Sequence, residues 1–290
     1  MKKKIQFEQI TSIEPEWIKT QMNKFILEDC PNSDNTTETI INTSSTTIAE
    51  IISVDNFIFC GEKVIPFCFP ESCRVSELIK DGQEINKGTI IAKISGPTRS
   101  ILTYERIVLN LIQRLCGIAT ETRRYCNLKL PKFFKVMDTR KTTPGLRLFE
   151  KYAVHVGGGW NHRLDLSSAI LIKDNHIQVA GSVKSAIRLI RENNETQRPI
   201  ELEVDTLHQL QEGLAMNIDG FLLDNMSPNQ VKKAVQIIRE SLDGESIFVE
   251  ASGGINYETL ESYAWTGIDG VSMSAITAHA LPVDIKLEIN

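Results

Sequence analysis

The chain has 290 residues, of which 41% are hydrophobic and 24% charged, a composition typical of a globular protein with one large or two ordinary domains. Its net charge of −5 argues against a nucleic-acid-binding protein, because such proteins normally carry a basic excess. No apolar run approaches the roughly 18 residues of a membrane helix, and the charged segment 1–5 precedes no apolar stretch of the kind found in export signals.

The first third of the chain predicts a small α+β domain. Apolar residues at steps of three and four predict a helix over 5–30, and the polar, threonine-rich stretch 30–47 predicts a loop. Short β runs separated by turn signals follow and favour an antiparallel sheet. These runs are 57–60, 64–65, 67–69 and 89–94.

A helix is predicted over 103–125, and beyond it an apolar strand repeatedly ends in a polar group and is followed by a polar helix. The predicted strands are 133–137, 169–172, 200–204, 220–223, 247–251 and 270–273, and the predicted helices are 183–193, 206–215, 230–242 and 256–265. This alternation predicts a parallel sheet. Polar groups at the carboxyl ends of six strands favour an incomplete (β/α) barrel, with a doubly wound open sheet as the alternative.

Cysteine usage indicates a reducing compartment. The six cysteines form no Cys-x-x-Cys pair in a long chain without an export signal. We therefore expect free thiols rather than disulfides or a zinc site, and a cytoplasmic enzyme.

Three polar strings follow predicted strands and carry most of the functional information. They are Asp138-Thr-Arg-Lys-Thr-Thr-Pro-Gly145, Val156-Gly-Gly-Gly-Trp-Asn-His-Arg163 and Leu171-Ile-Lys-Asp-Asn-His176. Lysine and arginine are rarely buried unpaired, and they donate charge-assisted hydrogen bonds to carboxylate and phosphate. Each string alone is explained by a charged turn. Together they favour a pocket for a small polyanion, lined by Arg140, Lys141, His162, Arg163 and Lys173.

Other strand ends carry carboxylates and glycines. Glu203 and Asp224 suit Mg²⁺ or ribose hydroxyls, or else form structural ion pairs with the lysines; Glu201 shares a strand face with Glu203, so either can be the working carboxylate. The string 252–254, Ser-Gly-Gly, at a predicted helix start favours a phosphate site. Lys173 can alternatively form a Schiff base with a carbonyl substrate, which makes an aldolase-like lyase the mechanistic competitor.

With these residues assembled, the chain closely resembles the quinolinate phosphoribosyltransferases, the decarboxylating nicotinate-nucleotide pyrophosphorylases. The resemblance runs almost from end to end. It also includes Leu27-Glu-Asp29, Asp34-Asn-Thr-Thr37, Glu105-Arg106, Leu109-Asn110, Gly117-Ile-Ala-Thr120, Leu223-Asp-Asn225 and Glu250-Ala-Ser-Gly-Gly-Ile255. The resemblance implies an N-terminal α/β sandwich domain over 1–108, to which the tail 278–290 adds, and a C-terminal incomplete α/β barrel over 109–277.

The family resemblance also implies an activity. Quinolinate and phosphoribosyl pyrophosphate react with Mg²⁺ to give nicotinate mononucleotide, pyrophosphate and CO₂ for the synthesis of NAD. It implies a homodimer with shared active sites, or a higher homo-oligomer, and neither a nucleic-acid nor a membrane partner. The alternatives are a paralogous phosphoribosyltransferase acting on another aromatic acid or base, and a non-catalytic metabolite-binding protein that retains the pocket.

Residue roles follow from the matching motifs. The resemblance places Arg140, Lys141, His162, Arg163 and Lys173, with Thr139 of the same string, around the two carboxylates of quinolinate and the nearby phosphate. It brings Arg106 from the partner subunit and assigns Glu203 and Asp224 to the ribose and the metal. It makes Lys141, Lys173, Glu203 and Asp224 the catalytic groups. The resemblance also implies that the 5′-phosphate is bound by Ser252, Gly253, Gly254, Ser274, Ala275 and Ile276.

Four positions depart from the usual family pattern. Asp165 and Ser168 stand where Gly and Asp are common, Ser274 replaces the Gly of the last phosphate loop, and Cys116 replaces Ser. A side chain at Ser274 is expected to crowd the phosphate, and Asp165 adds negative charge near the arginines. These departures favour the same reaction class with weaker activity or with a different pyridine acid.

Overall fold

The computed structural model describes residues 3–194 and 197–289, so Met1 and Lys2, used in the export-signal argument, lie outside the described residues. The chain forms two compact units. We call residues 1–9, 125–142 and 159–275 the barrel unit, and residues 10–124, 143–158 and 276–290 the sandwich unit. The domain boundary expected after residue 108 stays a prediction, and it falls inside one long helix, α3 (Thr98–Cys126). No described helix combines the length and apolar character needed to span a bilayer.

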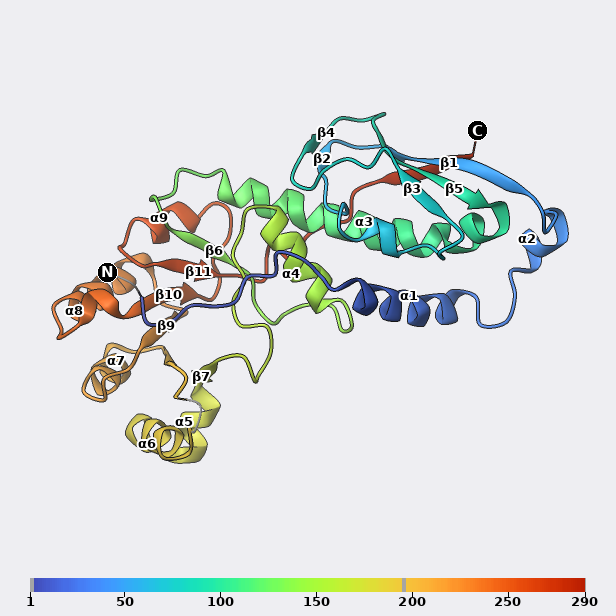
Figure 1. The fold of residues 1–290 in the computed structure, drawn as a ribbon. Helices are drawn as coiled ribbons and strands as arrows, with labels where there is room; N and C mark the ends of the chain where they lie inside the picture. Colours follow the sequence, from blue (N-terminus) through green and yellow to red (C-terminus); the bar gives the residue numbers. More distant parts are fainter. Residues whose placement is uncertain (1–2, 195–196, 290) are drawn as a thin grey trace. The chain divides into compact units, whose positions relative to one another are not determined.

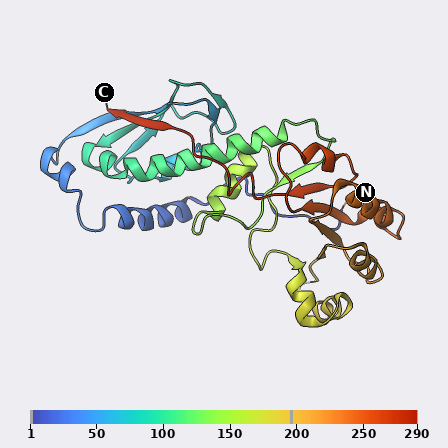
Figure 2. The ribbon, with the colours of Figure 1, turned by 180° about the vertical axis from the view of Figure 1, so that it is seen from behind.

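The sandwich unit is built on an antiparallel sheet, as predicted, although only one of its four strands, residues 90–97, coincides with a predicted β run, 89–94. Its strand order is β12-β1-β5-β3, and α3 lies along one face of the sheet in both views (Figures 1 and 2). The strands are β1 (Thr46–Ser53), β3 (Arg74–Ser76), β5 (Ile90–Pro97) and β12 (Ile285–Ile289), with a separate pair formed by β2 (Phe57–Ile58) and β4 (Glu84–Ile85). Its other helices are α1 (Pro15–Asp29), α2 (Asn35–Ile40) and α4 (Arg147–Val156). From Ala49 on, the residues of β1 alternate between buried and half-buried, as expected for a sheet with one covered face.

Three local predictions in this region were wrong. The helix expected over 5–30 begins only at α1, where Pro15 takes a first-turn position that needs no N–H donor. The expected loop 30–47 contains α2, whose first turn is capped by the Asp34 carboxylate accepting from the Thr37 N–H at 2.9 Å. The β runs expected at 64–65 and 67–69 are replaced by a 3₁₀ turn, Ile65–Phe67, because Pro66 lacks the donor that a sheet needs.

The barrel unit contains the six predicted strands in one parallel sheet ordered β6-β11-β10-β9-β8-β7 (Figure 1). The strands are β6 (Lys135–Met137), β7 (Ile170–Ile172), β8 (Ile200–Val204), β9 (Gly220–Asp224), β10 (Phe248–Ser252) and β11 (Gly270–Ser272). From β7 to β11 the order follows the chain, and β6 closes beside β11. The doubly wound alternative requires a reversal of this order, so it is wrong, and the incomplete barrel is confirmed.

Helices follow the strands on their outer side (Figure 1). They are α5 (Asp174–Ala180), α6 (Val183–Asn193), α7 (Leu207–Leu214), α8 (Pro228–Arg239) and α9 (Leu260–Ala264). Strand register then decides which side chains share the opposite face. Glu201 pairs with Gly220 and Glu203 with Leu222, while Ser252 pairs with Asp224. Because side chains alternate along a strand, these residues all point to one face of the sheet.

Candidate active site

The carboxyl ends of four neighbouring strands carry a half-buried polar rim. We use this name for Lys173, which follows β7, Glu203 of β8, Asp224 of β9 and Ser252 of β10. The Lys173 Nζ lies 2.8 Å from Glu203 Oε2, and the Ser252 hydroxyl donates to Asp224 Oδ1 at 2.8 Å. The structure therefore brings these predicted residues to one edge of the sheet. Each is half-buried and hydrogen-bonded to another polar side chain, so a ligand can replace that partner.

A second set of predicted residues follows β6. The buried Asp138 carboxylate accepts hydrogen bonds from Asn161 Nδ2 at 2.7 Å and from the His162 backbone N–H at 2.9 Å. This brings the segment carrying Arg163 beside the segment carrying Arg140. Burial, and next the charge of Arg140, lower the pKa of Arg163.

Arg163 is buried and Arg140 is half-buried, so both guanidinium groups lie in a partly desolvated place. The Nε of Arg140 is buried and has no acceptor among the described residues. A buried donor without an acceptor beside a second cation is the arrangement expected of an anion receptor.

His162 lies deeper than the sequence suggested. Its side chain is 5% exposed, with Nε2 3.1 Å from Glu250 Oε1 and 3.6 Å from Glu201 Oε2. Its Nδ1 accepts the Arg163 backbone N–H at 2.7 Å. That nitrogen therefore carries no proton, so the ring proton belongs on Nε2, which donates to Glu250. Direct contact between His162 and a ligand stays a prediction.

We call His162, Glu201 and Glu250 the buried triad. Burial raises the pKa of both carboxyl groups to about 8, and the charge of Glu250 adds to the effect on Glu201. Because Glu201 is buried and Glu203 is half-buried at the rim, the geometry favours Glu203 as the ligand-facing carboxylate. The sequence analysis named Glu250 only within a family string and gave it no role. Its signal was a lone acid inside the apolar β10 run.

The ligand atoms of the triad lie within 4.8 Å of one another, a spacing that a metal ion can span. A metal at this point would need the lone pair of His162 Nε2. The bond from the Arg163 N–H to Nδ1 leaves the ring proton on Nε2 instead. The geometry therefore favours a hydrogen-bonded triad over a metal centre.

The predicted phosphate loop 252–254 has a different local structure from the one expected. Helix α9 is shorter than predicted and begins only at Leu260, so the glycines do not open it. Gly253 and Gly254 instead have φ angles of 88° and 64°, and a Cβ on Gly253 would lie 2.1 Å from Asn225 Oδ1. Glycine adopts positive φ at little steric cost, and without side chains the backbone of this turn can approach an anion closely.

Comparison with known proteins agrees with this architecture. Models of the quinolinate phosphoribosyl transferase N-terminal and C-terminal domains match residues 34–116 and 118–288. The chain belongs to the quinolinate phosphoribosyltransferase family. A probable nicotinate-nucleotide pyrophosphorylase [carboxylating] from Bacillus subtilis is 39% identical over 275 residues, covering 94% of this chain and 93% of the relative. A relative of the same name from Methanocaldococcus jannaschii is 38% identical, covering 92% and 95%.

Solved structures of the family agree as well. The crystal structure of NadC from Streptococcus pyogenes is 35% identical with a TM-score of 0.87, covering 97% of this chain and 99% of that one. The nicotinate-nucleotide pyrophosphorylase from Francisella tularensis is 33% identical with a TM-score of 0.87, covering 98% and 100%. The fold of the family therefore extends over nearly the whole chain.

Two departures from the family pattern form a closed local turn. The Asp165 carboxylate accepts from the backbone N–H groups of Ser167 and Ser168, each at 2.9 Å. The hydrogen bond from the Ser167 hydroxyl is the largest cause that lowers the pKa of Asp165. Its negative charge is thus satisfied within its own loop. Cys116, a third departure, is buried in the sandwich unit and accepts from the Cys60 N–H at 3.3 Å.

Other family positions follow β6 and β11 of the same sheet. Thr139 Oγ1 accepts the N–H of the exposed Lys141 at 2.9 Å. Ser274 and Ala275 follow β11 and are half-buried, whereas Ile276 is fully buried and belongs to the sandwich unit.

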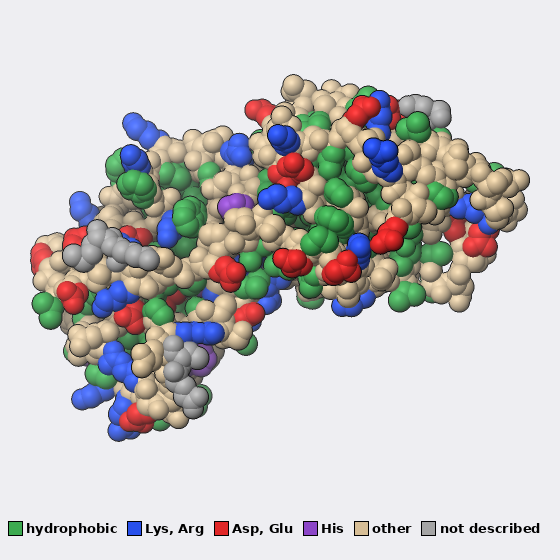
Figure 3. All heavy atoms as spheres, in the orientation of Figure 1, with side chains coloured by type: hydrophobic (Ala, Val, Ile, Leu, Met, Phe, Trp, Pro, Cys, Tyr) green, Lys and Arg blue, Asp and Glu red, His purple; other side chains and the backbone are tan. Residues whose placement is uncertain are grey.

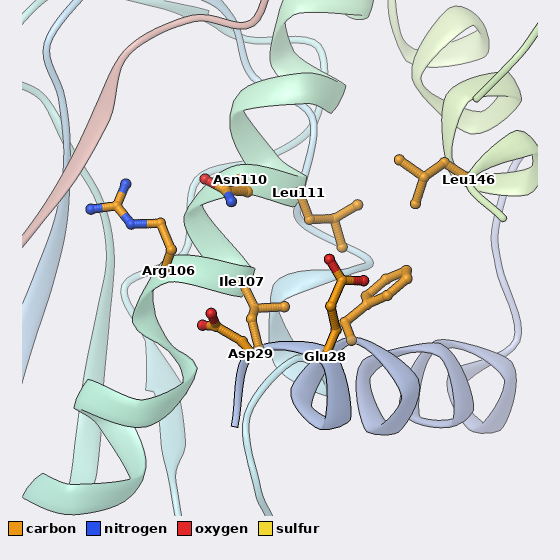
Figure 4. A pocket seen from close by; sticks show the side chains of 8 residues that line it. Glu28, Asp29, Arg106, Ile107, Asn110, Leu111 and Leu146 are labelled. Carbon is orange, nitrogen blue, oxygen red and sulfur yellow. The ribbon is translucent and has the colours of Figure 1, made fainter. Parts of the chain in front are cut away.

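Arg106 is exposed on α3 and lines a cavity of about 290 Å³ in the sandwich unit. Figure 4 shows Arg106 and Asn110 on successive turns of α3, with Glu28 and Asp29 at the end of α1. The other lining residues are Phe25, Ile107, Leu111 and Leu146.

On the face shown in Figure 3, Lys and Arg are interspersed with Asp and Glu.

Proposed function

We propose that the chain transfers the phosphoribosyl group of phosphoribosyl pyrophosphate to quinolinate and releases pyrophosphate and CO₂. The product is nicotinate mononucleotide, a precursor of NAD. The single observation that carries this proposal is the buried Nε of Arg140, which has no acceptor among the described residues and follows β6 beside the segment that carries Arg163. Relatives named nicotinate-nucleotide pyrophosphorylase [carboxylating] support it.

The side chains account for both bonds that break. The two arginines bind the acid groups and orient the pyridine nitrogen toward C1 of the ribose. As the bond to pyrophosphate breaks, the sugar gains positive charge, and the Glu203 carboxylate at the rim stabilises it. The ribosylated ring nitrogen is cationic and accepts the electron pair of the bond to CO₂ as that bond breaks. A proton then replaces CO₂ on the ring carbon.

We propose Mg²⁺ as the cofactor. Mg²⁺ prefers carboxylate oxygens and usually binds proteins through one or two of them together with substrate phosphates. Glu203 and Asp224 meet that requirement, since both are half-buried at strand ends. When bound, the ion would neutralise the leaving pyrophosphate.

The lyase alternative fits the geometry less well. A Schiff base needs an uncharged lysine amine. The Lys173 Nζ instead donates to Glu203 Oε2 at 2.8 Å, a geometry suited to binding an acid group rather than to attacking a carbonyl. Lys173 is therefore better suited to binding the acid substrate or its phosphate.

One assay tests the function. The protein is incubated with quinolinate, phosphoribosyl pyrophosphate and Mg²⁺, and CO₂ and pyrophosphate are measured together. Release of both in equal amounts is expected. Pyrophosphate release that occurs only with another aromatic acid would indicate the paralogous activity. If no acid that is tested leads to pyrophosphate release, the chain is a binding protein. Borohydride trapping of a carbonyl substrate on Lys173 would establish the lyase instead.

We propose a homodimer whose active sites include Arg106 of the partner subunit. The exposure of Arg106 beside a cavity and the family resemblance support it. Mixing the inactive variants Arg106→Ala and Lys173→Ala should restore activity, because a mixed dimer contains one site with neither substitution. No recovery after verified subunit exchange would contradict shared sites.

The six free cysteines support a reducing, cytoplasmic location.

A further inference from the structure

Residues 3–9 belong to the barrel unit, while the following stretch folds in the sandwich unit. The Lys3 Nζ lies 3.0 Å from an Asp269 carboxylate oxygen, and the Lys4 N–H donates to the Ser246 carbonyl at 3.0 Å. Ile5 is buried against Met137 and Phe248. Since Ser246 and Asp269 precede β10 and β11, this segment enters the barrel from the amino ends of its strands.

The sheet ends at β6 on one side and β7 on the other, and one residue extends it beyond β6. Trp160 pairs in parallel with Met137: its N–H donates to the Val136 carbonyl at 2.8 Å, and its carbonyl accepts from the Asp138 N–H at 3.0 Å. Peptide groups of successive residues in an extended chain point in opposite directions. The N–H and carbonyl of Asn161 therefore face away from β6, toward the open side.

Gln9 supplies both partners that a neighbouring strand would otherwise provide. Its Oε1 accepts the Asn161 N–H at 2.8 Å, and its Nε2 donates to the Asn161 carbonyl at 3.1 Å. The same Nε2 donates to the Phe7 carbonyl at 3.0 Å, which ties the amide to its own segment. Asn161 is 1% exposed, so water cannot readily replace either bond.

Phe7 packs against His162, the residue that follows Asn161. Its ring stacks on His162 with the centroids 4.1 Å apart and an angle of 27°, and it meets Phe248 edge-on at 6.1 Å. Phe7 and Gln9 thus hold two consecutive residues from one side, while Asp138 holds the same two from the other. The residue that follows them is Arg163.

We propose that Gln9, supported by Phe7, is a positioning residue of the active site. It fixes the backbone of Asn161 and His162 and thereby the direction in which Arg163 presents its guanidinium to the acid substrate. A primary amide from the N-terminal segment takes the place of the missing strand at the open edge of the barrel. The identity of the acid rests on the proposed function, whereas the positioning does not.

The test compares Gln9→Met with Gln6→Met. Methionine retains the length of the side chain and removes its hydrogen bonds, and Gln6 is an exposed glutamine of the same segment. Gln9→Met should raise KM for quinolinate about tenfold, since buried partners of Asn161 are lost, and should change KM for phosphoribosyl pyrophosphate less than about twofold. Amide hydrogen exchange should accelerate at residues 160–163. Gln6→Met should resemble the wild type in every measurement.

Two outcomes would overturn the proposal. One is an unchanged KM for quinolinate in Gln9→Met. The other is an equal rise of both KM values with faster exchange throughout the barrel unit, which is the sign of a merely structural role. If the wild type does not turn over quinolinate, the proposed function fails on its own. Hydrogen exchange then decides: acceleration confined to 160–163 supports positioning, and unchanged exchange there refutes it.

Discussion

The polar rim and the buried triad contain the same kinds of side chain in opposite surroundings. At the rim, Lys173 and Glu203 are half-buried and form an ion pair at 2.8 Å. In the triad, His162 donates to Glu250, while Glu201 Oε1 and Glu250 Oε2 are buried without a partner among the described residues. Rim groups can exchange their partners for a ligand at low cost. Triad groups lack water to replace a partner, so they suit a fixed frame beneath the site.

The largest expected effect on turnover comes from the two arginines proposed to bind the acid substrate, Arg140 and Arg163. Arg140→Ala should reduce turnover by about a hundredfold to a thousandfold, because a preorganised cation facing the acid is lost. Its thermal unfolding should change little, since the Nε of Arg140 has no acceptor within the described protein. The measurement is steady-state kinetics with a melting curve. Arg188→Ala, on the exposed face of α6, is the matched control, and near-normal turnover in Arg140→Ala would remove its assigned role.

The triad should affect stability as a function of pH. Burial raises the pKa of Glu250 to about 8 in the folded protein, above its ordinary value. Between about pH 4.5 and 8 the folded protein retains a proton that the unfolded chain has lost. Stability therefore falls as pH rises through this window, by up to about 1.4 kcal/mol per pH unit for one carboxyl group.

Glu250→Gln has no such proton to lose, so its stability should depend less steeply on pH. Urea unfolding at about pH 5, 6.5 and 8 would measure the difference, with the exposed Glu258→Gln as the control. Parallel pH profiles for the wild type and Glu250→Gln would show that Glu250 does not titrate in this window.

The smallest effect is expected where the chain departs from its family. Ser274→Gly restores the usual glycine of the phosphate loop and removes a side chain that is expected to crowd the phosphate. KM for phosphoribosyl pyrophosphate should fall about twofold, a free-energy change of only a few tenths of a kcal/mol. KM for quinolinate serves as the internal control. An unchanged or higher KM for phosphoribosyl pyrophosphate would show that Ser274 does not crowd the phosphate.

Local patterns predicted the regular parts of the barrel unit well. The strand 200–204 and the helix 183–193 have the predicted bounds, because apolar–polar alternation and helical spacing can be read from neighbouring residues in the sequence. The polar groups at strand ends were equally visible, since parallel strands bring their carboxyl ends to one edge. The helix expected over 5–30 was wrong over its first part, 5–14. Ile5 packs instead against Met137 and Phe248, which are distant in sequence.

The sequence by itself predicted the order of strands and helices and the cations at the strand ends, and it favoured the incomplete barrel without excluding a doubly wound sheet. It left Glu201 and Glu203 equivalent, because alternation places both on the same face of β8. Only the tertiary structure separated them: packing buries Glu201 with His162 and Glu250 and leaves Glu203 at the rim. The pairing of Gln9 with Asn161 could likewise not be predicted from the sequence, since these two residues are far apart along the chain and meet only in the folded barrel unit.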